Sequence, residues 1–190
     1  MATISRRTFV ETALSSSLLR LSFPVGAGTL LLTPEAARAR ELPLRTLTHA
    51  QAGILELLGE TILPGSAQLG LIHFLDHQLS ADPNDALLIA KYFQVALPYH
   101  AFYQSGADVA MSMAQRSTGK AIPDMNASEL RALVKEISEP GKAYDGFPIN
   151  LFYVCLRSDA VDVVYGSPRG FKLLNIPYME HIAPPEGWDG

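Results

Sequence analysis

Apolar residues recur at helical spacing along most of this chain, and prolines and glycines separate the runs. The first run begins at Thr48-His49-Ala50-Gln51, a capping box in which the Thr side chain covers a free backbone N–H and Gln reaches back. Ile54, Leu57 and Leu58 follow at helical spacing, and Pro64-Gly65 breaks the pattern. The spacing therefore predicts a helix from Thr48 to about Leu63.

Two further helices are predicted between Ser66 and Ser117. The first runs from about Ser66 to Ser80, and the second from Ala86 to about Ser117, with Pro98 expected to kink or split it because proline removes a helical hydrogen bond. The side chains expected to be buried in the second helix are Leu87, Leu88, Phe93, Phe102 and Met111.

The remaining pattern completes an all-α prediction. Asn126-Ala127-Ser128-Glu129 starts another helix, which Glu139-Pro140-Gly141 ends, and a last strong helix is predicted over residues 150–164. Residues 165–190 are rich in Gly, Pro and aromatics, which predicts an irregular C-terminal arm. No alternating strand pattern is evident, so we expect a compact bundle of five or six helices.

The N-terminus has the pattern of a twin-arginine export signal. Ser5-Arg6-Arg7-Thr8-Phe9-Val10 precedes a mildly apolar stretch, and Ala37-Arg38-Ala39 fits an A-x-A cleavage site. The alternative is an amphipathic or transmembrane helix, which Arg20 and Pro24 disfavour. The expected domains are a signal over residues 1–39, cleaved after Ala39, and one helical domain over residues 40–190, placed in the periplasm.

Charge and cysteine content narrow the functional classes. Removing residues 1–39 takes four arginines and two glutamates from the 15 basic and 19 acidic residues of the chain, which leaves a net charge of −6. This balance argues against nucleic acid and anionic lipid as partners. The single cysteine, Cys155, cannot form an internal disulfide, and its apolar neighbours suggest a buried side chain, with an intermolecular bridge as the alternative.

The histidines of the predicted second helix are the strongest metal-ligand candidates. His73 and His77 are four residues apart and share a helix face, and Asp76 lies three residues from His73. A site of this kind needs a third ligand, and the alternative is that both histidines lie on a polar or partner-facing stripe.

Aromatic residues between Phe93 and Tyr103 are the other candidate binding feature. Phe93, Tyr99, Phe102 and Tyr103 could stack a flavin or a sugar, but their helical spacing favours a place in the core. Motifs for dinucleotide, phosphate-loop or haem attachment are missing from the sequence. A chain with the export signal of a folded cofactor protein and no cofactor motif suggests that the cofactor lies on another chain.

The layout resembles the gluconate 2-dehydrogenase subunit 3 family over roughly Leu47 to Trp188. The resemblance rests on Glu60-Thr61-Ile62-Leu63-Pro64-Gly65, the stretch from Gly70 to His77, Phe152-Tyr153-Val154-Cys155-Leu156-Arg157 with Tyr165-Gly166, and Asn175-Ile176-Pro177-Tyr178 in this order. Members of this family are small subunits of bacterial membrane-associated flavoprotein dehydrogenases.

The resemblance implies a non-catalytic role with no catalytic, cofactor-binding or metal-binding residue in this chain. FAD would be held by a large partner of the glucose–methanol–choline oxidoreductase type, which would oxidise a sugar or sugar acid, and a cytochrome c subunit with haem c would take the electrons. The small subunit would carry the folded flavoprotein to the twin-arginine translocase and stabilise it afterwards, at the membrane through its partners.

The C-terminal arm is the predicted partner interface, because large apolar residues gather on a segment with little core of its own. The interface candidates are Tyr165, Gly166, Phe171, Pro177, Tyr178, Met179 and Trp188. In the alternative, the arm wraps back over the last helix. Two other functions stay open at this point: a stand-alone metal-dependent enzyme using His73 and His77, and a maturation chaperone absent from the final complex.

Overall fold

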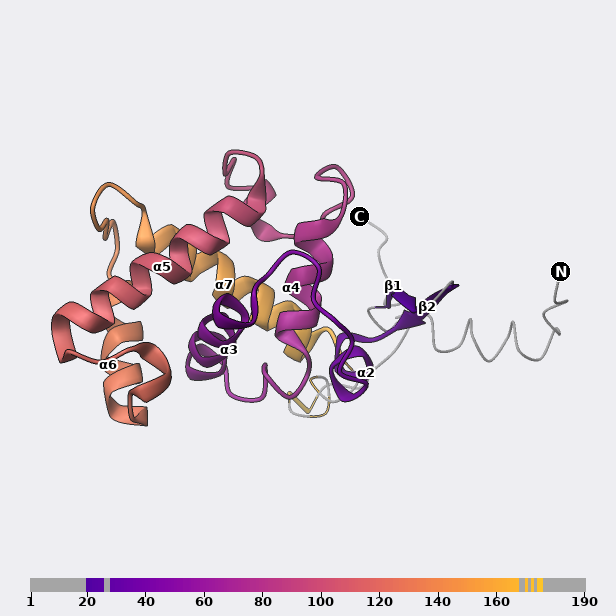
Figure 1. Ribbon diagram of the computed structural model, residues 1–190, viewed down its shortest axis with the longest axis horizontal. Helices are drawn as coiled ribbons and strands as arrows, with labels where there is room; N and C mark the ends of the chain where they lie inside the picture. The colour runs from indigo at the N-terminus through magenta and orange to yellow at the C-terminus, as the bar shows by residue number, and fades with distance from the viewer. Residues whose placement is uncertain (1–19, 26–27, 168–169, 171, 173, 176–190) are drawn as a thin grey trace, which may run out of the picture.

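Helix α7 (Ile149–Tyr165) runs through the middle of a helical bundle and contacts α3 (His49–Ile62), α4 (Leu71–Ser80), α5 (Tyr99–Thr118) and α6 (Ala127–Ile137) (Figure 1). This computed structural model describes residues 20–25, 28–167, 170, 172, 174 and 175. Over these residues the predicted all-α class is confirmed, and a two-stranded hairpin is the one sheet.

Two predicted helix starts are confirmed together with their caps. The Thr48 hydroxyl accepts a hydrogen bond from the Gln51 N–H at 3.2 Å, and the Gln51 side chain accepts one from the Thr48 N–H at 3.1 Å. Asn126 and Glu129 form the same reciprocal pair at the start of α6. Such caps satisfy N–H groups that have no partner within the helix, and each typically contributes about 1 kcal/mol.

The turn between α3 and α4 is organised by a carboxylate. Glu60 accepts hydrogen bonds from the N–H of Gly65 at 2.9 Å and of Ala67 at 3.0 Å. Residues 64–70 consequently form turns, and α4 begins at Leu71 instead of near Ser66 as the sequence predicted.

The helix predicted from Ala86 to about Ser117 is confirmed only after Pro98, where a kink or split was expected, and the prediction is wrong before Pro98. Residues 81–98 form a connection that contains only a short 3-10 turn, η1 (Ile89–Lys91), and α5 begins after Pro98. The physical reason is that the side chain of Gln78 accepts the Leu87 N–H at 2.8 Å, which holds this backbone in a non-helical path. Pro98 then occupies the N-cap position of α5.

Helices α5 and α7 pack unusually closely where they cross. A Cβ atom on Gly106 would lie 2.1 Å from a ring carbon of Phe152, so only glycine fits there. Tyr103, one turn earlier on α5, is fully buried and donates a hydrogen bond to Asp159 of α7, which is fully buried as well. This contact fixes the two helices at the centre of the core.

The region predicted to be an export signal contains two strands that the sequence did not predict. Strands β1 (Leu21–Val25) and β2 (Gly28–Leu32) pair antiparallel, and α2 (Pro34–Ala39) follows them at one end of the bundle (Figure 1). Leu21 and Phe23 are buried, whereas Ser22 and Pro24 are exposed. The alternation of buried and exposed side chains is only four residues long and lies among Gly and Pro, so the sequence pattern does not predict a strand there.

Candidate functional site

The side chain of His73 lies between α4 and the chain that follows α2. Its Nε2 is 3.1 Å from the carbonyl oxygen of Leu42, so Nε2 carries the proton and donates. Its Nδ1 is buried and has no hydrogen-bond partner among the described residues. Burial lowers the pKa of His73 from its usual value, which keeps the ring neutral near pH 7.

His77 lies one turn further along α4 and makes different contacts. Its ring meets that of Phe23 in an edge-on arrangement with the centroids 5.3 Å apart. Its Nδ1 is 3.5 Å from the side-chain nitrogen of Gln78. Burial, and then the nearby positive charge of Arg45, lowers the pKa of His77. Both histidines are thus used in packing against neighbouring segments.

Asp76, which lies between the two histidines in the sequence, holds the chain before α3 in place. Its carboxylate accepts hydrogen bonds from the backbone N–H groups of Arg45, Thr46 and Leu47, at 2.8, 2.8 and 2.9 Å. The side chain is 4% exposed, and these three donors occupy it. Over the part of the chain that the structure describes, no three His, Cys, Asp or Glu side chains are grouped as metal ligands.

A pocket of about 440 Å³ opens beside His73, between the end of α2, α3 and α4. Positively and negatively charged side chains line this pocket. The Nε of Arg38 and the Oε1 of Glu56 are 3.6 Å apart, and His49 also forms part of the wall. Glu41 adds a second carboxylate to the wall, so the lining carries charges of both signs and does not by itself indicate one class of ligand.

The aromatic residues at the start of α5 divide between core and surface. The rings of Phe102 and Phe147 are 5.4 Å apart, and Phe102 also meets Tyr103 and Phe152 edge-on. The expectation of a place in the core is confirmed for Tyr103, which is fully buried, whereas Phe102 is half-buried and packs against the core. Phe93 is 48% exposed and was wrongly expected to be buried.

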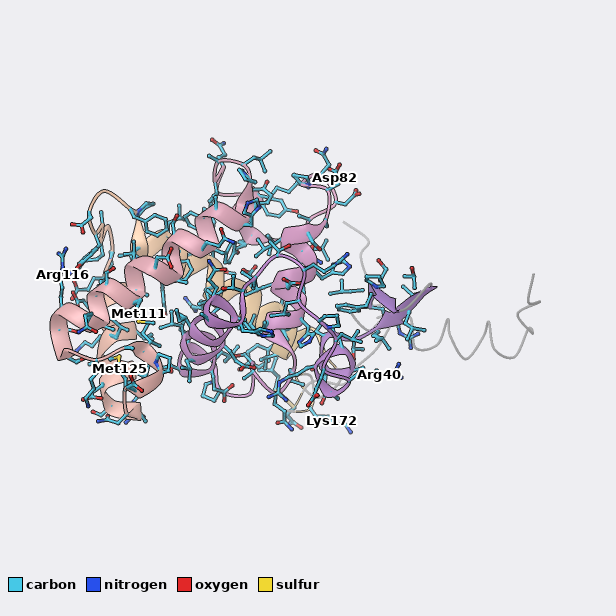
Figure 2. All side chains as sticks on the ribbon, viewed as in Figure 1. Arg40, Asp82, Met111, Arg116, Met125 and Lys172 are labelled. Atoms are coloured by element: carbon cyan, nitrogen blue, oxygen red, sulfur yellow. The ribbon has the colours of Figure 1, made fainter. Side chains whose placement is uncertain are left out.

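Most of the exposed large apolar side chains of the described residues lie on the connection between α4 and α5, and the others are Leu30 and Leu31 of β2 and Leu174. Leu87, Tyr92, Phe93 and Leu97 are 54%, 75%, 48% and 59% exposed, and we call these four residues the connection surface. The connection forms the upper edge of the bundle in Figure 1, and Asp82, labelled in Figure 2, marks its beginning. The expectation that Leu87 is buried is wrong as well.

The connection surface is held in place by its neighbours in the sequence. Leu88 and Ala90 lie between Leu87 and Tyr92 in the sequence and are fully buried in the core. The Val95 N–H donates to the Ala90 carbonyl at 3.1 Å, and the Lys91 ammonium donates to the Asn84 carbonyl at 2.6 Å. Exposed aromatic and aliphatic groups on an anchored backbone are typical of protein–protein contact sites.

A shallow hollow of about 270 Å³ adjoins the connection surface. It lies between Leu97 and the first turns of α5, and Phe102 and Ser105 form part of its wall. An apolar side chain of a partner could enter it, which is the usual arrangement around an interface anchor.

Cys155 is fully buried, as the sequence indicated. Burial, and then the nearby Asp159, raises the pKa of the thiol to about 12, so the thiol stays protonated and unreactive.

Most of the predicted terminal sites lie outside the described residues. Tyr165 ends α7 half-buried, and Gly166 follows it as an exposed C-cap. The other interface candidates, Phe171, Pro177, Tyr178, Met179 and Trp188, are not described, nor are Arg6, Arg7 and Phe9 of the export signal. Ala37 and Ala39 of the predicted cleavage site lie in α2.

Comparison with known proteins found no matching family model, no matching curated protein and no matching solved structure. Among the described residues, no helix is long and apolar enough to span a lipid bilayer.

Proposed function

We propose that this chain is the non-catalytic small subunit of an exported FAD-dependent dehydrogenase similar to gluconate 2-dehydrogenase. It binds a large flavoprotein, carries it folded through the twin-arginine route and stabilises it in the periplasm. The reaction is oxidation of a sugar or sugar acid on the partner, and electrons leave through a cytochrome c subunit. The order of the motifs from Glu60 to Tyr178 and the Arg6-Arg7 pair support this proposal.

The observation that carries the proposal is the connection surface. Four large apolar side chains face solvent on a backbone anchored by Leu88 and Ala90. A stable free monomer gains nothing from exposing them, whereas a subunit that is buried against a partner gains the free energy of removing them from water. A role in binding is therefore favoured over a role in chemistry.

Charge substitution on this surface tests the proposal. Tyr92→Asp and Phe93→Asp place a carboxylate where the partner would have to bury it, so each variant should reduce the flavoprotein recovered with the tagged chain by at least about tenfold. Ala132→Asp is the matched control, because Ala132 is an exposed residue of α6, a helix that lies away from the connection (Figure 1). This variant should still bind the flavoprotein.

Stoichiometry separates a subunit from a maturation chaperone. A subunit remains in the purified periplasmic enzyme in an equal molar amount, whereas a chaperone is absent from it.

Equal recovery of the flavoprotein by the two surface variants and by wild type would contradict a binding role for the connection surface.

A further inference from the structure

The hairpin strands before the predicted cleavage site pack against the helical domain. Leu21 and Phe23 of β1 are 5% and 6% exposed, and both belong to the hydrophobic core. The Phe23 ring covers His77 of α4. A signal peptide that leaves the protein would not be expected to supply buried core side chains.

Helix α2 also packs against α4. Ala37 is fully buried, and the α2 backbone lies directly against the turn before α4. A Cβ atom on Gly70 would be only 2.2 Å from the carbonyl oxygen of Pro34, so the two backbones are in contact. Arg38 pairs with Glu56 of α3, which links α2 to a third element.

The predicted scissile bond, between Ala39 and Arg40, lies within hydrogen-bonded backbone. The Arg40 N–H donates to the Ala36 carbonyl at 3.3 Å, and the Leu42 N–H donates to the Ala37 carbonyl at 3.2 Å. An A-x-A peptidase reads small side chains at positions 37 and 39 on an extended chain. Here position 37 is helical and buried, so the substrate conformation requires α2 to unfold and leave α4.

We infer that folding closes the Ala37-Arg38-Ala39 site, so that the exported protein keeps its N-terminal segment as part of the domain. For the protein in the cell, this inference rests on the proposed export of a folded chain, because only then is the site closed when the peptidase meets it. The closure itself depends only on the contacts of residues 20–39.

Trypsin tests the closure without any export. Trypsin cuts after Arg38 and Arg40, which flank the predicted site, and cutting at a folded site requires local opening. We expect the purified full chain to be cut at these two bonds at least about tenfold more slowly than a synthetic peptide of residues 34–45, with products identified by mass.

Two hairpin variants of similar hydrophobicity sharpen the test. Phe23→Ser removes a buried contact with α4 and should raise the rate of cutting at Arg38 and Arg40 toward that of the peptide. Leu31→Ser changes a side chain that is 63% exposed on the same hairpin and should leave the rate unchanged. Protection of Arg157, which is exposed on α7, shows in each sample that the bundle is still folded.

Intact-mass measurement on the exported protein completes the test. The expected mass is that of the full chain, 20.6 kDa, for wild type and Leu31→Ser. Cutting of the folded wild type at the rate of the peptide, or an exported folded protein that begins at Arg40, would overturn the inference. Failure of the subunit proposal alone would leave the trypsin result intact, so the two failures are distinguishable.

Discussion

Asp159 carries the most strongly perturbed carboxyl group among the described residues. Burial raises its pKa from 3.8 to about 7, and the hydrogen bond from Tyr103 opposes only part of that rise. The pKa of Tyr103 is raised in turn, first by burial and then by Asp159. The pair lies at the contact between α5 and α7 and both side chains are fully buried, so we interpret it as a structural pair.

This pair predicts a specific dependence of stability on pH. Between about pH 4 and pH 7 the folded protein holds the Asp159 proton, whereas the unfolded chain has lost it, so stability falls as pH rises through that range. The contribution of Asp159 to the free energy of unfolding, taken as the difference between wild type and Asp159→Asn in urea titrations, should therefore decrease by a few kcal/mol from pH 4 to pH 7 and level off above pH 7.

Asp159→Asn should remove most of this decrease, because the amide can still accept the Tyr103 hydrogen bond and does not ionise. Tyr103→Phe should extend the decrease to higher pH, since it removes the hydrogen bond that lowers the pKa. If wild type and Asp159→Asn lost stability equally between pH 4 and pH 7, the account of this residue would be wrong.

At the scale of elements, the crossing of α5 and α7 depends on the absence of a side chain at Gly106. Gly106→Ala places a methyl group 2.1 Å from the Phe152 ring, so the helices must separate. We expect a loss of about 2 kcal/mol in the free energy of unfolding, measured by urea titration.

Gly53→Ala is the matched control for this substitution. Gly53 lies inside α3, and a Cβ atom there would meet nothing within 4 Å. Alanine is a better helix former, so Gly53→Ala should raise stability by about 0.5–1 kcal/mol. Equal effects of the two substitutions would indicate that the helix crossing is not tightly packed.

Local hydrogen-bond chemistry made several elements predictable from the sequence. The caps at Thr48 and Asn126 require only residues within one turn, and the starts of α3 and α6 follow from them. The connection before α5 was not predictable in this way, because its path depends on Gln78, nine residues before its partner Leu87. A helical pattern of leucine and phenylalanine also does not show whether these side chains will face the core or the solvent.

The candidate site was missed for the same reason. The sequence placed Leu87 and Phe93 in a core, and only the packing of Leu88 and Ala90 shows which side of the connection faces solvent. Prolines at positions 83 and 98 bracket the connection and were the one available signal of a non-helical segment. The role of Asp76 was not predictable either, because its carboxylate binds three backbone N–H groups that lie about thirty residues earlier, which no residue spacing indicates.

At the scale of the whole molecule, three features point toward assembly. The connection surface exposes apolar groups at one edge of the bundle, a shallow hollow adjoins it, and the N-terminal segment packs as part of the fold. A bundle of this kind has its own core, yet it offers a partner an anchored surface with an adjoining hollow. The central claim is that this partner is a flavoprotein.

The most direct test of that claim is one purification from the periplasm. The chain, tagged at its C-terminus, is expressed with the flavoprotein dehydrogenase expected beside it, and the eluate is examined by visible spectrum and mass. The account predicts flavin absorption bands and a large chain in an equal molar amount. A colourless small protein that elutes alone, while the flavoprotein reaches the periplasm without it, would contradict the account.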